Sequence, residues 1–417
     1  MKLGFRTFER RGDFFYINGK PRRMLGANHT PMSIRPNDAV LADTFLRKMH
    51  DGGLFFTRTT TAPFNETWLQ AADRQGVAVS FEGAFPWLMM RGDIPDSNLL
   101  RLWREEFFDL VRSARNHPSV LLWTVNNEMK FYEKDTVRAR VQAKFRIVSD
   151  VVKSLRQLDP TRPVVFDSGY RRDTAKFDRK FMAGIDDGDA DDIHSYFNWY
   201  YFSIFDCFDS TFTRWYKNPG RPLISQEFSS GYPTNDAGHP TRFYTYPHYV
   251  PQALVGQWAY EDHDPRYFLE RQAFIAKEGF EGLRRSTTSL AGLQAFSSIC
   301  WFRDVYDAAR ISPYPTYEAM KLAAQTVLVS AELWSRHFYA GDTLRARVCV
   351  VNDGSDGRDL PASKLRWRID YQGVSLASGE QAVPSVAHFS RHWDSLAIRL
   401  AAPQPPEGGV YGAGQLP

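Results

Sequence analysis

A regular alternation of two kinds of segment runs from about residue 22 to residue 325 and constrains the fold more than any other feature. Short apolar runs alternate with longer amphipathic runs of helical spacing. This alternation is typical of βα units around a parallel sheet. The apolar runs predict strands over 23–28, 54–59, 77–82, 119–125, 163–167, 192–196, 222–227 and 293–301. Eight such units close into a (β/α)8 barrel, which needs about 250 residues.

The pattern changes after about residue 327. Segments such as 344–351 and 365–371 alternate between apolar and polar residues, with turn residues between them. Period-two alternation of this kind predicts an immunoglobulin-like β-sandwich. We therefore expect two domains, a catalytic barrel over 1–325 and a sandwich over 326–417 that need not hold a full strand set.

Composition excludes several classes of protein. The net charge of +4 arises from 52 basic and 48 acidic residues, and no basic cluster carries interleaved aromatics, so a nucleic-acid partner is not expected. The pairs Arg171-Arg172 and Arg284-Arg285 are expected on solvated faces. Cys207, Cys300 and Cys349 are widely spaced and odd in number, which supports neither a disulfide framework nor a cysteine metal site.

The sequence shows no membrane or export signal. No run of about 18 apolar residues is present, and the segment from Met1 to Arg6 lacks the apolar core of a signal peptide. We therefore expect no membrane partner and a cytoplasmic location. A homo-oligomer is compatible with the sequence.

Two glutamates end apolar strands in matching contexts. Glu128 follows the predicted fourth strand after Asn126 and Asn127, and Glu227 ends the predicted seventh strand. Chemistry on a (β/α)8 barrel lies at the carboxyl ends of the strands, so both side chains should meet at one mouth. Paired carboxylates there can cleave a glycosidic bond as acid/base and nucleophile. A single such glutamate would more often start a helix or pair with arginine.

Several short motifs lie in order over most of the first 310 residues. They are Gly4-Phe5-Arg6, 15–21 (FYINGKP), 25–29 (LGANH), 116–120 (NHPSV), Asn127-Glu128 and 221–227 (RPLISQE). Together, in this order, they resemble glycoside hydrolase family 2, the family of β-galactosidases, β-glucuronidases and β-mannosidases. Only the combination is specific.

The resemblance implies a retaining double displacement without a cofactor. Glu128 would be the general acid/base and Glu227 the nucleophile that forms a covalent glycosyl-enzyme. Because Glu128 must be protonated in the first step, we expect its surroundings to raise its pKa.

The resemblance also implies a set of substrate-binding residues. Asn127 would bind the sugar 2-hydroxyl, and Arg58 would hold Glu227 ionised. Tyr196 would donate to the nucleophile and Trp301 would be the platform on which the sugar stacks, with core packing as the competing account for both. The remaining candidates are His29, His194 and Asp304.

Three departures from the family limit what the resemblance implies. The chain begins where the family barrel begins, so the N-terminal domains that often shape the site are not expected. An aromatic-rich insertion over 231–265 would form a lid, an extra sugar subsite or rim packing. The Asn-x-Lys signature of carboxylate-reading glucuronidases is not found after the eighth strand, although Arg303 or Lys130 could meet a uronate.

These features leave three functions open. The leading prediction is an exo-acting β-glycosidase, with a β-galactoside as the expected substrate. The alternatives are an endo-acting barrel hydrolase of the same clan, or a carbohydrate-binding protein with weak turnover. The histidines of the insertion show no metal-ligand spacing such as HExxH, so no metal is expected.

Overall fold

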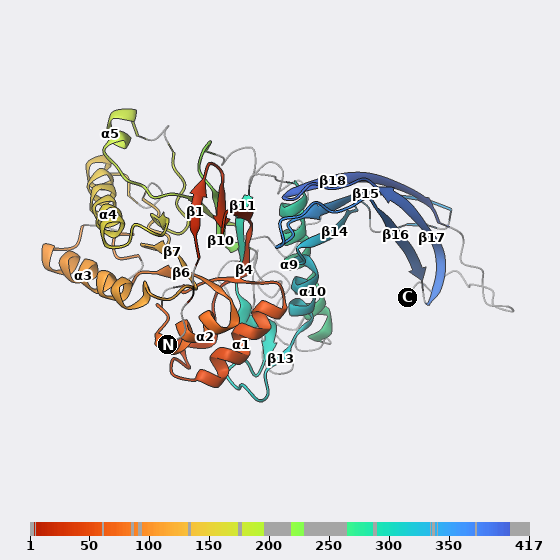
Figure 1. Cartoon of the computed structure of the whole chain (residues 1–417), viewed down its shortest axis with the longest axis horizontal. Helices are drawn as coiled ribbons and strands as arrows, with labels where there is room; N and C mark the ends of the chain where they lie inside the picture. The colour runs from red at the N-terminus through yellow and green to blue at the C-terminus, as the bar shows by residue number, and fades with distance from the viewer. Residues whose placement is uncertain are drawn as a thin grey trace. The chain divides into compact units, whose positions relative to one another are not determined.

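The computed structural model describes residues 4, 6–60, 62–84, 87–90, 94–131, 135–173, 177–195, 218–228, 265–286, 290–333, 335, 338–339, 341–371 and 373–400. The chain divides into two compact units, residues 1–326 and 327–417 (Figure 1). None of the helices within the described ranges is long and apolar enough to cross a membrane.

The first unit is a barrel of eight parallel strands. In sheet order they run β8-β7-β6-β5-β4-β11-β10-β9, so the last strand in the chain, β11, pairs with the first, β4. Between β8 and β9, hydrogen bonds from Asp189 N to Val164 O (2.7 Å) and from Asp192 N to Tyr170 O (2.8 Å) join the two edges. The strands are β4 (Met24–Ala27), β5 (Phe56–Arg58), β6 (Ala78–Glu82), β7 (Val120–Thr124), β8 (Val164–Val165), β9 (Asp191–Ser195), β10 (Leu223–Phe228) and β11 (Leu290–Ala295).

The (β/α)8 fold class predicted from the alternation is therefore confirmed. The prediction for the eighth strand was wrong in its bounds, because β11 ends at Ala295 and the 3-10 helix η3 (Ser298–Trp301) follows it. The strand count itself holds, so Glu128 follows the fourth barrel strand and Glu227 lies on the seventh.

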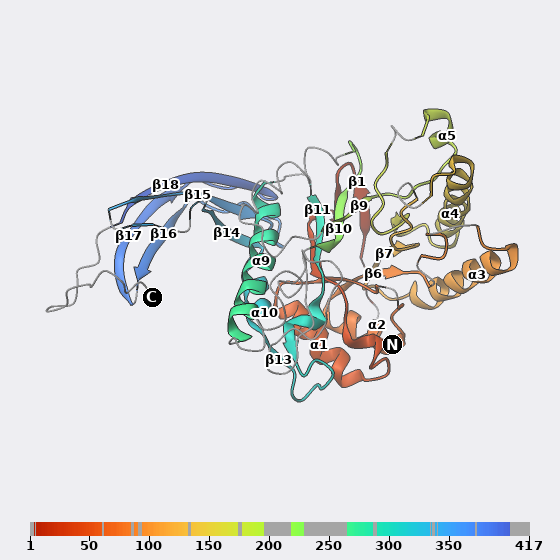
Figure 2. The same cartoon turned by 180° about the vertical axis from the view of Figure 1, so that it is seen from behind.

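Helices connect the strands around the outside of the barrel, as Figure 2 shows from behind. Capping side chains set several of their ends. The Asp38 carboxylate caps α1 by accepting from Leu41 N, Asn65 caps α2, and Gly76 ends α2 in the left-handed conformation. The helices are α1 (Ala39–Asp51), α2 (Glu66–Gln75), α3 (Ser97–Ala114), α4 (Arg138–Leu158), α5 (Arg179–Ala183), α9 (Pro265–Ser286) and α10 (Pro315–Ala323), with the 3-10 helix η1 (Pro31–Ser33).

Of the two arginine pairs predicted on solvated faces, Arg284-Arg285 is buried instead, whereas Arg171 and Arg172 are partly exposed. Arg284 is fully buried and donates to the backbone oxygens of Ala323 and Gln325 at the end of α10. Arg285 is also buried, and Arg172 pairs with Asp187. The prediction for Arg284-Arg285 was wrong because a buried guanidinium can satisfy carbonyl groups at a helix end, which charge pattern alone does not reveal.

A small antiparallel sheet closes the amino-terminal end of the barrel. It contains β1 (Phe8–Arg11), β2 (Phe14–Ile17) and β3 (Lys20–Arg22). Phe8 and Phe15 stack with ring centroids 5.1 Å apart and are buried against residues from the barrel strands. These neighbours are Met24, Phe56, Ala78, Leu121, Leu122, Val165, Ala190, Ile224 and Ala291. One end of the barrel is therefore apolar and sealed, which leaves the carboxyl-terminal end for chemistry.

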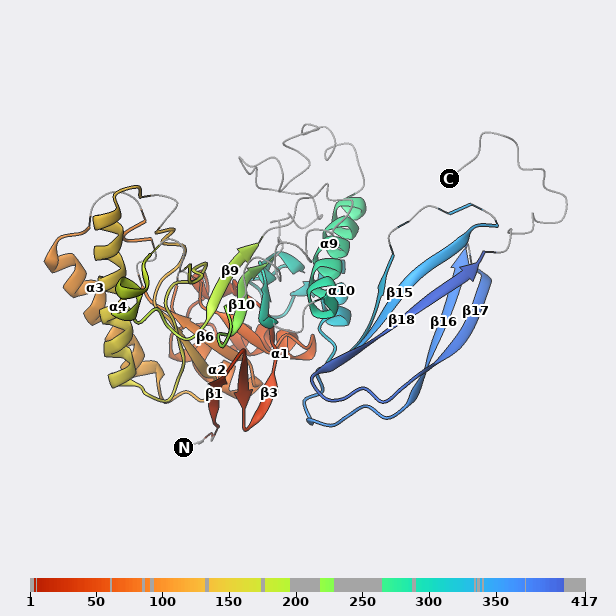
Figure 3. The same cartoon turned by 90° about the horizontal axis from the view of Figure 1, so that it is seen from above.

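The second unit is a sandwich of two antiparallel sheets (Figure 3). One sheet contains β14 (Val327–Glu332), β15 (Thr343–Asn352) and β18 (Ser390–Arg399), and the other contains β16 (Ser363–Tyr371) and β17 (Val374–Val383). Val350 of the first sheet packs in one apolar cluster with Val383 of the second. The segments predicted from period-two alternation lie in β15 and β16, which confirms them as strands.

The apolar seal predicts a large cost for truncating Phe15. We expect Phe15→Ala to lower the free energy of unfolding by about 3–5 kcal/mol, because a fully buried ring would be replaced by a cavity. Urea denaturation measures this loss. Tyr16→Ala, on the opposite face of β2, is the control and should cost about 1 kcal/mol or less. Equal losses for the two variants would contradict the assignment of the seal.

Candidate active site

The carboxyl ends of β7 and β10 bring the two predicted catalytic glutamates together. Glu128 lies in the loop after β7, and Glu227 lies on β10. One carboxylate oxygen of each glutamate and a ring nitrogen of His194 all lie within 4.8 Å of one another. The side chain of Glu128 is 22% exposed and that of Glu227 is 6% exposed, so Glu128 is the more accessible carboxylate.

Arg58, at the end of β5, is the cation of the site and is completely buried. Its Nη2 contacts Oε1 of Glu227, and its Nε lies 2.9 Å from Oε2 of Glu82. Its Nη1 donates to the hydroxyl of Ser168. Burial by itself would lower the pKa of Arg58, but the charges of the surrounding carboxylates outweigh it and raise that pKa. The guanidinium therefore stays charged and favours the ionised form of Glu227.

Asn127 and His29 both lie beside this cation. Asn127 is buried, and its Oδ1 accepts from Arg58 Nη2 at 3.3 Å. It does not cap the next helix, because α4 begins only at Arg138. His29 has a positive φ of 58°, and its Nδ1 lies 2.9 Å from Asn28 Oδ1. Burial lowers the pKa of His29 to about 4, so this imidazole is neutral near pH 7.

His194 lies between the two glutamates. It is the register partner of Glu227 in the pairing of β9 with β10. Its Nδ1 is 2.8 Å from Glu128 Oε1 and 3.4 Å from Glu227 Oε2, and its Nε2 is 2.9 Å from Ser168 Oγ. Burial lowers the pKa of His194, but the charge of Glu227 and the hydrogen bond to Glu128 outweigh it, so the net shift is upward.

The expected direction of the Glu128 pKa shift was wrong. Burial pushes this pKa upward, but the hydrogen bond from His194, the charge of His194 and the charge of Lys130 together lower it. Lys130 Nζ lies 3.4 Å from Glu128 Oε2. In the free site, a neighbouring imidazole therefore competes with Glu128 for the proton. Sequence reasoning considered only burial and Glu227, both of which raise the pKa of Glu128.

The backbone around Glu128 is held in unusual conformations. Glu128 has a φ of 47°, and its N–H donates to Ser168 O at 2.7 Å. Gly169 has a φ of +90°, and a Cβ there would lie 3.4 Å from both Glu128 Cγ and His194 Nδ1. Positive φ at a residue other than glycine is uncommon and often marks a functional site. Glycine at 169 both permits its own conformation and leaves room for the two side chains.

Four polar residues of the site were missed by sequence reasoning. They are Glu82, Ser168, Asp192 and Gln226, and all four are buried. Glu82 could have been found, because it ends the third predicted strand just as Glu227 ends the seventh. Ser168 and Asp192 carry no such signal, because serine and aspartate at strand ends are common in turns and caps.

One predicted substrate-binding residue, Trp301, is placed elsewhere. Trp301 is completely buried in the main core of the barrel, so its ring cannot be the open platform for a sugar. That prediction was wrong, and core packing is the account that holds. Asp304 forms an ion pair with Arg310 at 2.9 Å. Tyr196 and the insertion up to residue 264 lie outside the described residues, so their predicted roles are untested.

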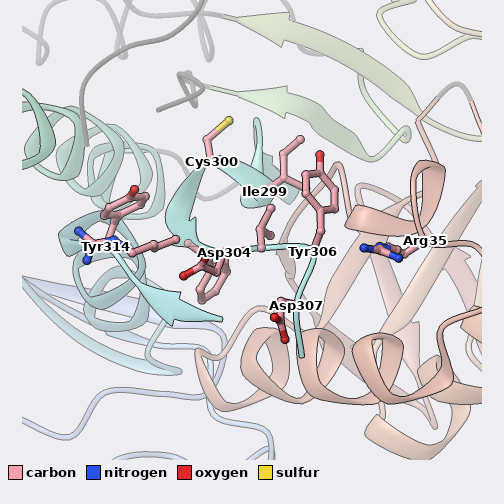
Figure 4. Close-up of a pocket in the computed structure, with 10 residues that line it drawn as sticks. Arg35, Ile299, Cys300, Asp304, Tyr306, Asp307 and Tyr314 are labelled. Atoms are coloured by element: carbon pink, nitrogen blue, oxygen red, sulfur yellow. The ribbon is translucent and has the colours of Figure 1, made fainter. Parts of the chain in front are cut away.

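A cavity of about 440 Å³ lies between the loops that follow β4 and β11 (Figure 4). Because both loops leave the carboxyl ends of neighbouring strands, the cavity opens at the catalytic end of the barrel. It combines two guanidinium groups with two carboxylates and two phenol rings. Its lining includes Arg35, Arg303, Asp304, Tyr306, Asp307 and Tyr314.

Glu128, His194 and Glu227 form the one group of three side chains, among the described residues, with metal-ligand spacing. Two of the three, Glu128 and His194, are hydrogen-bonded to each other, and Arg58 places a fixed positive charge against Glu227. A cation beside Arg58 would meet repulsion, so this arrangement is better suited to proton chemistry than to holding a metal ion.

Comparison with known families decides what kind of barrel this is. The family model described as "Glycosyl hydrolases family 2, TIM barrel domain" matches residues 8–264. The chain belongs to glycoside hydrolase family 2. Over 240 residues it is 29% identical to the β-glucuronidase of Mus musculus, a match that covers 55% of this chain and 34% of that enzyme. The chain thus covers about a third of that relative's length.

Solved structures of this family share the fold. The β-D-mannosidase of Dictyoglomus thermophilum aligns with a TM-score of 0.58 and 17% identity, covering 97% of this chain and 50% of that chain. The β-D-glucuronidase of the same organism aligns with a TM-score of 0.54 and 22% identity, covering 77% of this chain and 54% of that chain. The family resemblance inferred from the motifs is confirmed.

The buried cation predicts a pH-dependent loss of stability when it is removed. Arg58→Met should cost about 3–5 kcal/mol near pH 7, because the buried carboxylates of Glu82 and Glu227 would both lose the guanidinium that they contact. Their pKa values in the folded variant would rise above the unfolded values. The loss in the free energy of unfolding caused by Arg58→Met should therefore be largest above about pH 6. It should shrink toward pH 4, where both carboxyls protonate.

Urea denaturation of the wild type and of Arg58→Met across this pH range measures the effect. The double variant Arg58→Met with Glu82→Gln has one fewer buried carboxylate that has lost Arg58, so it should recover part of the stability at pH 7. A penalty that does not change with pH would show that Arg58 acts by packing alone.

Proposed function

We propose that this chain is a retaining exo-β-glycosidase that hydrolyses a terminal β-linked sugar through a covalent glycosyl-enzyme. The observation that carries this proposal is the 4.8 Å limit on the separation of the nearest oxygens of Glu128 and Glu227. Retaining enzymes hold their two carboxyl groups about 5 to 5.5 Å apart, whereas inverting enzymes need about 6.5 to 9.5 Å for an intervening water.

The surroundings of the two carboxylates support distinct roles. Glu227 is nearly buried and contacts Arg58, which favours the ionised form that a nucleophile requires. Glu128 is more exposed and can reach a leaving group or a water from the mouth of the barrel. Asn127 is held through its Oδ1 by Arg58, which leaves its Nδ2 to donate to the sugar 2-hydroxyl. That bond would strengthen in the transition state.

Two observations favour a uronide as a second candidate for the sugar, beside the β-galactoside expected from the sequence. Lys130 lies 3.4 Å from Glu128, and Arg35 and Arg303 line the cavity at the same end of the barrel. These cations could bind the carboxylate of a uronic acid. The relative from Mus musculus is named a β-glucuronidase, which supports the same candidate.

The alternatives from the sequence make separable predictions. An endo-acting hydrolase would require an oligosaccharide that extends beyond the terminal sugar, and a binding protein would retain a glycan without turnover. A binding protein does not need two carboxylates at a retaining separation with a buried arginine on one of them, so the site favours an enzyme. An endo-acting hydrolase of the same clan would use the same pair of carboxylates, so the length of the substrate that is hydrolysed separates it from the exo-acting enzyme.

Aryl glycoside hydrolysis tests the proposed function. The purified chain should hydrolyse one member of a panel of aryl β-glycosides (galactoside, glucoside, mannoside, glucuronide, galacturonide and glucosaminide). Glu227→Gln should lower kcat by at least about 1000-fold, because the covalent route is lost. A 2-deoxy-2-fluoro glycoside of the same sugar should label Glu227, as mass spectrometry of the digested protein would show.

Glu106→Gln, on the exposed face of α3, is the control and should leave kcat unchanged. The configuration at the anomeric carbon of the product is measured by NMR. An inverted configuration would refute the retaining assignment. Hydrolysis of oligosaccharides alone would move the assignment to the endo-acting alternative.

The uronide candidate has its own test. If Lys130 binds a uronate, Lys130→Met should lower kcat/KM for the aryl β-glucuronide or β-galacturonide by about 10–100-fold, because a charge-assisted hydrogen bond is lost. The ratio of kcat/KM for the uronide to that for the matching neutral glycoside is the measurement. Arg303→Gln tests the cavity in the same way. Higher activity on the galactoside than on either uronide would favour the substrate expected from the sequence.

A further inference from the structure

His194 is placed to do more than line the sugar site. Its two ring nitrogens connect the acid/base Glu128 to a buried polar network at the ends of β8 and β9. The side chain of His194 is 6% exposed, so these contacts are shielded from bulk water. A titratable ring in contact with the acid/base can hold the proton that the reaction uses.

The hydrogen bonds around Asp192 determine which nitrogen of His194 carries a hydrogen. Asp192 accepts from Gln226 N (2.9 Å), Gln226 Nε2 (2.9 Å) and Ser168 Oγ (2.6 Å), so its oxygens are acceptors in all three contacts. Because the single hydroxyl hydrogen of Ser168 points at Asp192, Ser168 Oγ can only accept from its other neighbours. His194 Nε2, 2.9 Å away, therefore donates to Ser168.

The other nitrogen then shares one hydrogen with the acid/base. With Nε2 protonated, His194 Nδ1 either accepts from a protonated Glu128 or donates to an ionised Glu128, and the 2.8 Å separation suits both. We propose that Glu128 and His194 hold the catalytic proton jointly, with His194 as the positioning residue that stores it until the leaving group arrives. This inference rests on the proposed glycosidase function.

The two steps of the reaction return the catalytic proton to its starting position. In the first step the proton moves from His194 Nδ1 to Glu128 and from Glu128 to the glycosidic oxygen. The bond from that oxygen to the anomeric carbon breaks while Glu227 bonds to the same carbon. In the second step water attacks the anomeric carbon, the bond to Glu227 breaks, and the water's proton passes to Glu128 and back to Nδ1. One water is consumed.

The charges around His194 favour its protonated form before the first step and its neutral form after Glu227 has bonded to the sugar. Glu227 and Asp192 stabilise the imidazolium, whereas Arg58 opposes it, and Lys130 lies beyond Glu128. Asp167 also lies near, and burial raises its pKa well above the usual range. When Glu227 is esterified its charge is lost, so the imidazolium loses support. The pair then stays deprotonated, which is the state that a general base needs.

The pH profile with two leaving groups tests the proposal. In His194→Asn the proton would be held by a single carboxyl, so the alkaline limb of kcat/KM should move to lower pH by at least about one unit. At pH 7 the loss should be about 100-fold for a p-methoxyphenyl glycoside, whose leaving group needs the acid, and under about 3-fold for a 2,4-dinitrophenyl glycoside. Equal losses, or an unmoved alkaline limb, would overturn the proposal.

A matched control and a milder variant accompany this test. His117 also pairs with a carboxylate, Asp73, at 2.6 Å but lies away from the site, so His117→Asn should leave the limb and the leaving-group ratio unchanged. Ser168→Ala removes the group that accepts the hydrogen bond from Nε2 and keeps His194. It should move the alkaline limb of kcat/KM to lower pH by less than His194→Asn does. If His194→Asn does not fold, the result for Ser168→Ala decides, because an unchanged limb there overturns the proposal.

Nitrogen-15 NMR of the histidine rings tests the shared proton without any substrate. The His194 signals should titrate above the ordinary range for histidine, with Nε2 protonated throughout, and Glu128→Gln should lower that titration by at least about one unit. An unchanged titration in Glu128→Gln would refute the sharing. If the wild type hydrolyses no glycoside, the proposed function fails, yet this titration still decides whether the proton is shared.

Discussion

The buried guanidinium of Arg58 is the interaction on which the site depends. It contacts Glu82 from β6, Glu227 from β10 and Ser168 after β8, so one side chain joins the ends of strands that are far apart in the chain. A charge without solvent is stable only when it is paired and hydrogen-bonded. The carboxylates that satisfy Arg58 are themselves held in place by it, and its charge favours their ionised form, as the proposed role of Glu227 as nucleophile requires.

The two ends of the barrel differ in character: the amino-terminal end is packed with apolar side chains, and the carboxyl-terminal end holds the polar residues of the site. At the amino-terminal end, Phe8 and Phe15 seal an apolar interior. Near the carboxyl-terminal end the side chains become polar, with Ser80 Oγ and Thr124 Oγ1 2.8 Å apart and Gln226 bound to Asp192. Hydrogen bonds such as these help to explain how polar residues that would destabilise an ordinary core are tolerated at this end of the barrel.

The proposed role of His194 explains how Glu128 could act as a general acid although its neighbours lower its pKa. A general acid must carry a proton near neutral pH, whereas the contacts of Glu128 lower its pKa. Treating Glu128 and His194 as one titrating unit removes the conflict, since the proton lost by one is kept by the other. The short chain from Glu128 through His194 and Ser168 to Asp192 then has the same logic as other active sites in which one residue orients the next.

Sequence by itself determined the architecture and singled out the two glutamates that the fold brings together. Periodicity predicted eight βα units and a β-sandwich, and strand ends predicted Glu128 and Glu227, because these signals are local and repeat along the chain. Tertiary structure alone decided the rest. Trp301 is in the core, Arg284 is buried, and the proton of Glu128 is contested by His194, 66 residues further along the chain. Burial and pKa depend on neighbours brought together by folding, which no local pattern records.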